Sequence, residues 1–136
     1  MEKSNEEEIK KAYAELQLLN QQFQQIYQNL SLIEKQIIDL NLLKENIIEL
    51  KSIKKGTPLF VPLGSGVYIK STFDENSEIL VNVGSDTLVK KDIPESKRVI
   101  EQQIEKLTKI FNQMETELNN IAVNMQRLQE ELNEII

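Results

Sequence analysis

Two long stretches of the chain repeat apolar residues in alternating steps of three and four. The first seam consists of Ile9, Ala12, Leu16, Leu19, Phe23, Ile26, Leu30, Ile33, Ile37 and Leu40. The second seam consists of Ile100, Ile104, Leu107, Phe111, Met114, Leu118, Ile121, Met125, Leu128, Leu132 and Ile135. This spacing places apolar side chains at the a and d positions of a heptad repeat, which is typical of a coiled coil. We therefore predict two long helices, over residues 5–55 and 92–136.

Helix-end signals bound both stretches. Ser4 followed by Glu7, and Asp92 followed by Glu95, have the spacing of a capping box, in which the first side chain accepts a hydrogen bond from a backbone amide of the first turn. Gly56 closes the first stretch, because glycine readily adopts the positive φ found just after a helix. Since only a compact segment joins the two helices, we expect them to pack antiparallel and to finish together at one tip.

Residues 57–91 have the composition of β-strands. Runs of β-branched residues alternate with turns at 64–66, 74–77 and 84–86, which predicts two β-hairpins. Two hairpins are too few to bury their apolar face, so we expect other subunits to complete the sheet or barrel. The side chains expected at this assembly surface are Val61, Val67, Ile69, Phe73, Ile79, Val81 and Val83. The predicted fold class is α+β: a single domain over 1–136, in which a long antiparallel coiled-coil hairpin is joined by two β-hairpins that contribute to an inter-subunit β-barrel.

The composition argues against catalysis. The chain has no His, no Cys and no Trp, so the commonest general bases and zinc ligands are missing. Gly64-Ser65-Gly66 lacks both the third glycine of a dinucleotide-binding loop and the Lys-Ser/Thr pair of a phosphate loop, and it is better interpreted as a tight turn. We therefore expect no enzymatic activity, no cofactor and no metal site.

Charge and hydropathy exclude two further classes of partner. The formal net charge is −6 and the pI is about 4.8, whereas nucleic-acid binding needs a positive surface that displaces counterions from phosphates. No apolar run approaches the ~18 residues of a membrane-spanning helix, and the N-terminus lacks the apolar core of a signal peptide. We expect a soluble, cytoplasmic protein that binds neither nucleic acid nor membranes.

The tip where the two helices finish together is rich in apolar residues. A hairpin end has few neighbours, so we expect part of this surface to stay exposed, and exposed apolar patches usually mark binding sites. The alternative is that the seam simply continues into frayed last turns. The candidate binding residues are Ile9, Tyr13, Met125, Leu128, Leu132, Ile135 and Ile136.

The order helix, two hairpins, helix carries two specific blocks between the helices, LFVPLGSGVYIK at 59–70 and ILVNVG at 79–84. With these blocks the chain resembles an α-class prefoldin subunit of archaeal type. Members of that family often have a second glycine near position 86, where this chain has Asp86. Aspartate tolerates the left-handed backbone conformation, so we expect the second hairpin turn to form with Asp86 in place.

The resemblance implies a hexamer of two α-class and four β-class subunits, with the hairpins in a central β-barrel platform. It also implies an ATP-independent chaperone that binds non-native polypeptides at the coiled-coil tips and passes them to a group II chaperonin. Two alternatives stay open. One is a structural prefoldin-like protein that self-assembles into rings or filaments, and the other is a coiled-coil arm that binds RNA or another assembly.

Overall fold

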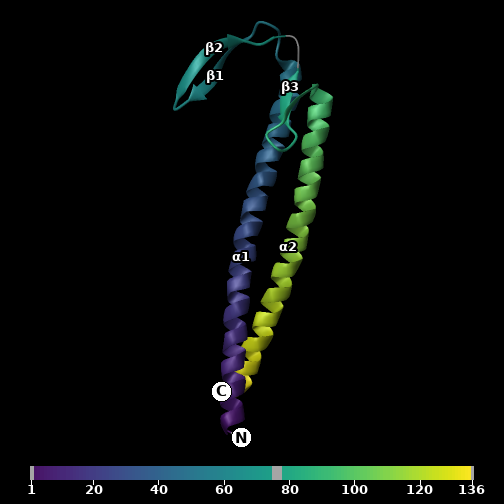
Figure 1. The fold of residues 1–136 in the computed structure, drawn as a ribbon. Helices are drawn as coiled ribbons and strands as arrows, with labels where there is room; N and C mark the ends of the chain where they lie inside the picture. The colour runs from purple at the N-terminus through teal and green to yellow at the C-terminus, as the bar shows by residue number, and fades with distance from the viewer. Residues whose placement is uncertain (1, 75–77, 136) are drawn as a thin grey trace. The chain divides into compact units, whose positions relative to one another are not determined.

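The computed structural model describes residues 2–74 and 78–135 (Figure 1). In chain order the elements are α1 (Glu2–Glu49), the 3-10 helix η1 (Leu50–Ser52), β1 (Pro58–Gly64), β2 (Val67–Thr72), β3 (Ile79–Asn82), β4 (Leu88–Lys91) and α2 (Ile93–Ile135). The four strands form two separate antiparallel hairpins, β1 with β2 and β3 with β4. Two long helices and two small hairpins confirm the predicted α+β class.

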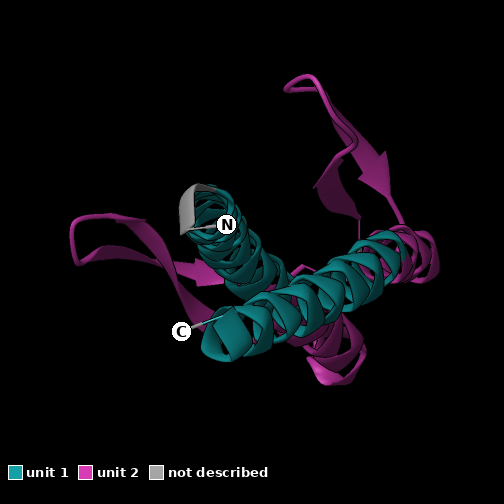
Figure 2. Cartoon of the chain, turned by 90° about the horizontal axis from the view of Figure 1, so that it is seen from below, with its two compact units in different colours: residues 1–37, 106–136 teal, residues 38–105 magenta. Residues whose placement is uncertain are grey.

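The chain divides into two compact units (Figure 2). Unit 1 consists of residues 1–37 and 106–136, and unit 2 consists of residues 38–105. Each unit therefore contains part of α1 and part of α2, and unit 2 also contains both hairpins. That residues 1–136 behave as one domain stays a prediction.

The predicted bounds of the first helix, 5–55, are wrong at both ends. α1 already begins at Glu2, so Ser4 lies inside the helix instead of capping it. At the other end α1 stops at Glu49, and the Ser52 hydroxyl donates a hydrogen bond of 2.7 Å to the Glu49 carbonyl. Gly56 serves a different turn, because Thr57 N donates to the Lys54 carbonyl at 3.2 Å while Gly56 adopts φ +84°. The glycine therefore directs the chain into β1 and does not cap the helix.

The predicted start of the second helix is confirmed by its hydrogen bonds. The Glu95 backbone amide donates to Asp92 Oδ1 at 2.8 Å, which is the contact expected of an N-cap. The Ser96 amide donates to the Asp92 carbonyl at 2.9 Å, closing the first turn. α2 then continues from Ile93 to Ile135, close to the predicted range of 92–136.

Asp92→Ala is expected to lower the free energy of unfolding by about 1 kcal/mol, because the first turn of α2 loses its side-chain acceptor. Urea unfolding followed by circular dichroism measures the change. Asp39→Ala is the matched control, since Asp39 is an exposed residue within α1 and caps no helix. Equal destabilisation by the two substitutions would contradict the assignment of Asp92 as the cap.

Both hairpins close through two-residue turns of the same kind. In the first, Gly64 pairs with Val67, and the intervening Ser65 and Gly66 adopt φ +48° and +81°. Positive φ at both central positions defines the turn whose twist matches paired strands. The register shifts between Pro62 and Gly64, so a bulge follows the proline, in agreement with the place of proline at irregular points of a strand.

The second hairpin forms its turn without a central glycine. Ser85 and Asp86 adopt φ +51° and +57°, and Thr87 N donates to the Gly84 carbonyl at 3.0 Å. Asp86 therefore takes the left-handed conformation expected of it in the sequence. The Gly84 amide also donates to Asn82 Oδ1 at 2.9 Å, which ties the start of the turn to the end of β3.

Packing in both units follows the heptad seams. Every residue of the first seam is half-buried, as expected for a helix that packs against a single neighbouring helix. In unit 2 a core forms around Ile47, Ile93 and Ile100. Lys44 occupies the a position after Leu40, and its Nζ lies 3.3 Å from Glu101 Oε1 on α2, so an ion pair replaces the apolar contact there. Among the described side chains of unit 1, Ile121, Leu128 and Leu132 are buried.

Candidate functional site

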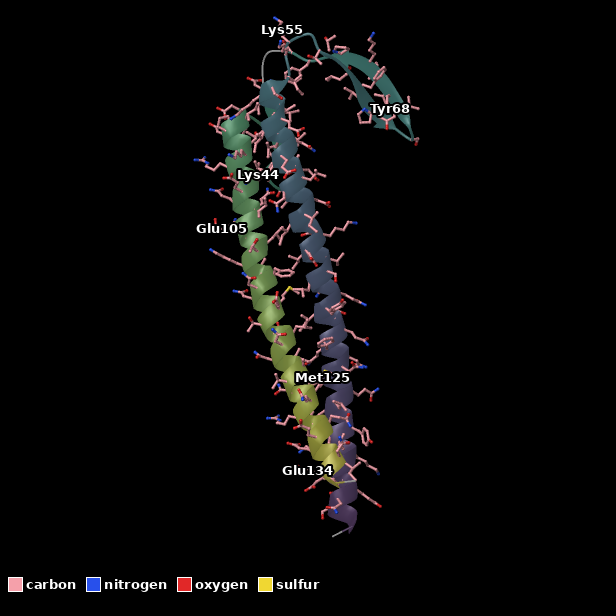
Figure 3. All side chains as sticks on the ribbon, turned by 180° about the vertical axis from the view of Figure 1, so that it is seen from behind. Lys44, Lys55, Tyr68, Glu105, Met125 and Glu134 are labelled. Carbon is pink, nitrogen blue, oxygen red and sulfur yellow. The ribbon has the colours of Figure 1, made fainter. Side chains whose placement is uncertain are left out.

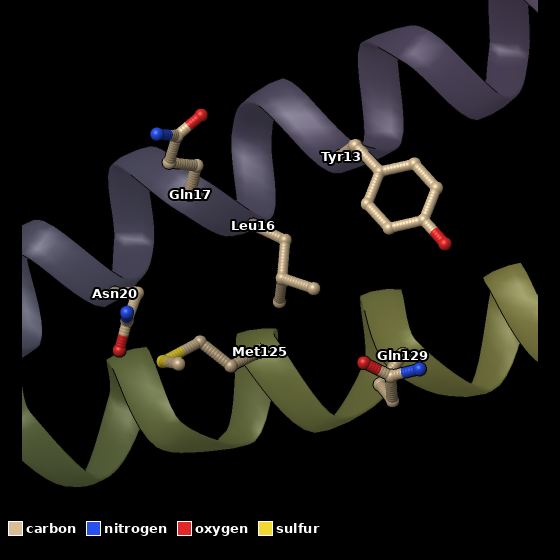
Figure 4. Close-up of a pocket in the computed structure, with 6 residues that line it drawn as sticks. All are labelled: Tyr13, Leu16, Gln17, Asn20, Met125 and Gln129. Carbon is tan, nitrogen blue, oxygen red and sulfur yellow. The ribbon is translucent and has the colours of Figure 1, made fainter.

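Unit 1 contains an open groove of about 590 Å³ between the first part of α1 and the last part of α2 (Figure 4). Its lining residues are Tyr13, Leu16, Gln17, Asn20, Met125 and Gln129. Leu16 extends from α1 into the gap and Met125 lies across from it on α2 (Figure 4). Tyr13 stands at one end with 52% of its surface exposed. The groove therefore offers an apolar floor with an aromatic side chain that is accessible to solvent.

The lining of this groove is neutral. None of the described lining residues is charged, and on α1 the whole stretch 16–33 lacks charged residues. The polar lining consists of three side-chain amides, from Gln17, Asn20 and Gln129. An uncharged, partly apolar surface favours an uncharged partner, because a charged group placed there loses hydration without gaining an ion pair.

The predicted tip residues that the structure describes differ in exposure. Leu128 and Leu132 were expected to contribute exposed surface, but they are only 6% and 0% exposed. They occupy seam positions, and contact with the facing helix buries them even close to the helix end. Tyr13 and Ile135 are 52% and 36% exposed and do offer surface to a partner.

Two of the remaining tip residues have intermediate exposure. Ile9 and Met125 are half-buried, and Met125 lines the groove (Figures 3 and 4). Ile136 lies outside the described residues. A role for any of the seven tip residues in binding stays a prediction.

The heptad pattern did not predict the three amides of the groove, because the repeat is defined by its apolar positions alone. A signal was present. Gln17 and Asn20 lie one and four positions after Leu16, and Gln129 lies four positions after Met125, so all three share or adjoin the seam face of their helix. This signal does not single the three residues out, because residues 16–33 contain no charged residue and several other Gln and Asn side chains.

The β1–β2 hairpin presents the largest set of exposed apolar side chains in unit 2. Val61 and Ile69 are direct cross-strand partners, with exposures of 40% and 52%, and Val67 is 55% exposed on the same face. The opposite face is also open, since Phe60 is 69% and Tyr68 is 60% exposed (Figure 3). A two-stranded sheet with both faces in water is marginally stable on its own, so this hairpin is suited to pairing with other strands.

The β3–β4 hairpin differs because one of its faces already packs within unit 2. Ile79 contacts the core of Ile47, Ile93 and Ile100, and Val81 is half-buried. Beside them an apolar groove of about 490 Å³ is lined by residues that include Leu43 and Leu80. Of the other predicted assembly residues, Val83 is 50% exposed and Phe73 is half-buried. Ile79 and Val81 therefore have a packing role inside the chain, and an additional role in assembly stays a prediction.

Two further features concern residues 2–74 and 78–135, the part of the chain that the structure describes. Within that part of the chain, no cluster of acidic side chains is arranged to hold a metal ion. Within the same ranges, neither helix has an apolar stretch long enough to cross a bilayer.

Comparison with known proteins matches the arrangement described above. A family model described as "Prefoldin subunit" matches residues 19–136. A protein of Methanosarcina acetivorans named "Prefoldin subunit alpha" is 30% identical over 128 residues, covering 92% of this chain and 90% of the relative. Proteins of the same name from Methanococcus aeolicus and Pyrococcus horikoshii are each 27% identical, covering 94% and 93% of this chain and 87% and 90% of their own lengths.

A solved structure has the same fold. It is titled "Cryo-EM structure of filamentous PFD from Methanocaldococcus jannaschii", and it superposes with a TM-score of 0.75 at 19% identity, covering 85% of this chain and 95% of that one. The family model and the archaeal relatives confirm the resemblance seen in the strand blocks. The chain belongs to the prefoldin family, whose subunits are non-enzymatic components of a chaperone.

Proposed function

We propose that this chain is the α-class subunit of an ATP-independent chaperone that binds non-native polypeptides in unit 1 and passes them to a group II chaperonin. The observation that carries the proposal is the open groove with the exposed Tyr13 at its end and Leu16 and Met125 along its floor. Family membership supports a chaperone-type function. The groove supplies the surface on which such a function would act.

The binding energy comes from burying apolar surface. A non-native polypeptide exposes side chains that a folded protein hides, and covering them gains about 25 cal/mol per Å² of apolar area. The floor of the groove is also adaptable, since Met125 has an unbranched, polarisable side chain that fits differently shaped partners. Ordering a disordered client costs entropy, so a single groove binds weakly. Several subunits of one assembly that hold the same client through their helix pairs supply avidity.

Assembly would proceed through unit 2. The exposed pair Val61 and Ile69, together with Val67, supports pairing of β1–β2 with hairpins of other subunits. The proposed partners are β-class prefoldin subunits, in a hexamer of two copies of this chain and four β-class chains. We place this complex in the cytoplasm, where newly made polypeptides and the chaperonin meet.

A second candidate function rests on the solved structure with the same fold. Its title describes a filamentous assembly, and the open faces of β1–β2 are compatible with repeated strand pairing between copies of one chain. In this alternative the chain is a structural protein that self-assembles into rings or filaments. The two candidates differ in whether a β-class subunit enters the assembly.

The proposed function is tested by light scattering of a chemically unfolded model client. The chain, mixed with a β-class subunit, is expected to suppress aggregation at near-stoichiometric amounts without nucleotide, and added ATP should change nothing. Subsequent addition of a group II chaperonin with ATP is expected to restore native client. Unchanged aggregation in the presence of the mixed assembly would contradict the proposal.

A further inference from the structure

The polar groups of the unit 1 groove are placed on both of its sides. Asn20 reaches from α1 toward α2, and Gln129 lies on the α2 side, while Leu16 and Met125 lie between them (Figure 4). Gln17 stands on the α1 rim with its amide directed away from α2 in this view. Asn20 and Gln129 thus flank the apolar floor.

These two amides retain hydrogen-bonding capacity. Within residues 2–74 and 78–135, the Asn20 side chain makes no hydrogen bond to another residue. The Gln129 amide donates a long hydrogen bond of 3.4 Å from Nε2 to Asn133 Oδ1, which leaves its Oε1 as an acceptor. Each side-chain amide offers the same donor and acceptor pair as a peptide group. The groove is therefore complementary to a polypeptide backbone as well as to an apolar side chain.

Such a surface distinguishes between client conformations. In a helix the backbone N–H and C=O groups are already paired with each other, whereas in an extended, non-native segment they are free. An apolar segment that enters the groove in a helical conformation fills the floor but leaves the amides unpaired and dehydrated, which costs free energy. An extended segment fills the apolar floor and also forms hydrogen bonds with the amides. The neutral lining adds a preference against charged segments.

We propose that Asn20 and Gln129 are specificity-determining residues that hydrogen-bond the backbone of an extended, uncharged client segment while Leu16 and Met125 contact its apolar side chain. This inference rests on the proposed function and narrows its substrate class. It selects segments whose backbone is unpaired, which is the property that separates a non-native polypeptide from the apolar surface of a folded helix.

The test uses a capped, uncharged peptide in which leucine alternates with serine and glycine, and its twin methylated on alternate backbone nitrogens. Both peptides carry a photo-cross-linker and are added to the assembled complex. The readout is the peptide concentration that gives half-maximal labelling of this chain, which is separated from the β-class subunits by mass. The wild-type chain is expected to label at about tenfold lower concentration with the unmethylated peptide, because methylation removes backbone donors. The double variant Asn20→Leu/Gln129→Met should label with both peptides within about twofold.

The control variant is Gln22→Leu/Gln126→Met, which removes two exposed amides of the same helices that do not line the groove. It should keep the tenfold preference. If the wild-type chain binds both peptides equally well, or if the double variant keeps the preference, the inference is wrong while the proposed function stands. If the wild-type chain labels with neither peptide and the assembly fails to suppress aggregation, the proposed function fails as well.

Discussion

Ile69→Asp is expected to prevent assembly with β-class subunits while leaving most of the helicity in place. Ile69 is 52% exposed and pairs across the hairpin with Val61, so the new carboxylate disturbs no buried contact of the chain itself. In an assembled sheet the same carboxylate would be buried without a partner. That costs at least ~3 kcal/mol, which weakens assembly by roughly a hundredfold. Sedimentation velocity measures the assembly, and far-UV circular dichroism measures the helicity.

Thr72→Asp on the same strand is the matched control. Thr72 is exposed and pairs with Pro58, on the face opposite to that of Ile69. It should assemble close to the wild-type level, because its carboxylate remains in water. Normal assembly of Ile69→Asp would show that the face of Val61 and Ile69 is not the one that other subunits cover. Val81 is less suited to this test, since it is half-buried within unit 2.

Tyr13→Asp is expected to lower the capture of an unfolded client by this chain about tenfold, with the oligomer intact. Tyr13 stands at the end of the groove and is 52% exposed, so its ring is available to a client and contributes little to the packing of the helices. Losing an aromatic contact and adding a charge both weaken the binding of an uncharged apolar segment. Photo-cross-linking of a labelled client to this chain measures capture, and sedimentation confirms the assembly.

Tyr27→Asp provides the comparison. Tyr27 is 56% exposed on the same helix and does not line the groove, although its ring stacks on Phe23 at a centroid distance of 6.4 Å. The substitution should leave client capture within about twofold of wild type, because it removes a similarly exposed aromatic side chain that lies outside the groove. If Tyr13→Asp and Tyr27→Asp lowered client capture equally, the whole helix surface would bind clients and the groove would have no special role.

The periodicity of the sequence was enough to predict the long elements. Heptad spacing determines which helix face is buried, and the seam residues from Ile9 to Leu40 are all half-buried as expected. The cap at Asp92 and the turn at Ser65-Gly66 could also be predicted from the sequence, because each depends on a local residue preference. The C-terminal end of the first helix was harder to predict, since Gly56 suits a helix end and a β-turn equally well. The hydrogen bond from the Thr57 amide to the Lys54 carbonyl shows that the turn forms.

Surface exposure could not be predicted in the same way. Leu128 and Leu132 read as exposed tip residues, yet seam packing buries them to 6% and 0% exposure. Ile79 read as an assembly residue, yet it packs against the core of its own unit. The burial of these residues was not predicted, because an apolar residue in the sequence does not reveal which neighbour covers it. Their roles in binding and assembly stay predictions. The amides of the groove were missed for the converse reason, since their role depends on residues that lie across the helix pair.

Native mass spectrometry of this chain mixed with a β-class subunit and an unfolded client tests the central claim most directly. We predict a discrete complex that contains two copies of this chain, four β-class subunits and one bound client, formed without nucleotide. A chain that remains monomeric, or that forms assemblies of itself alone with no client bound, would contradict the account.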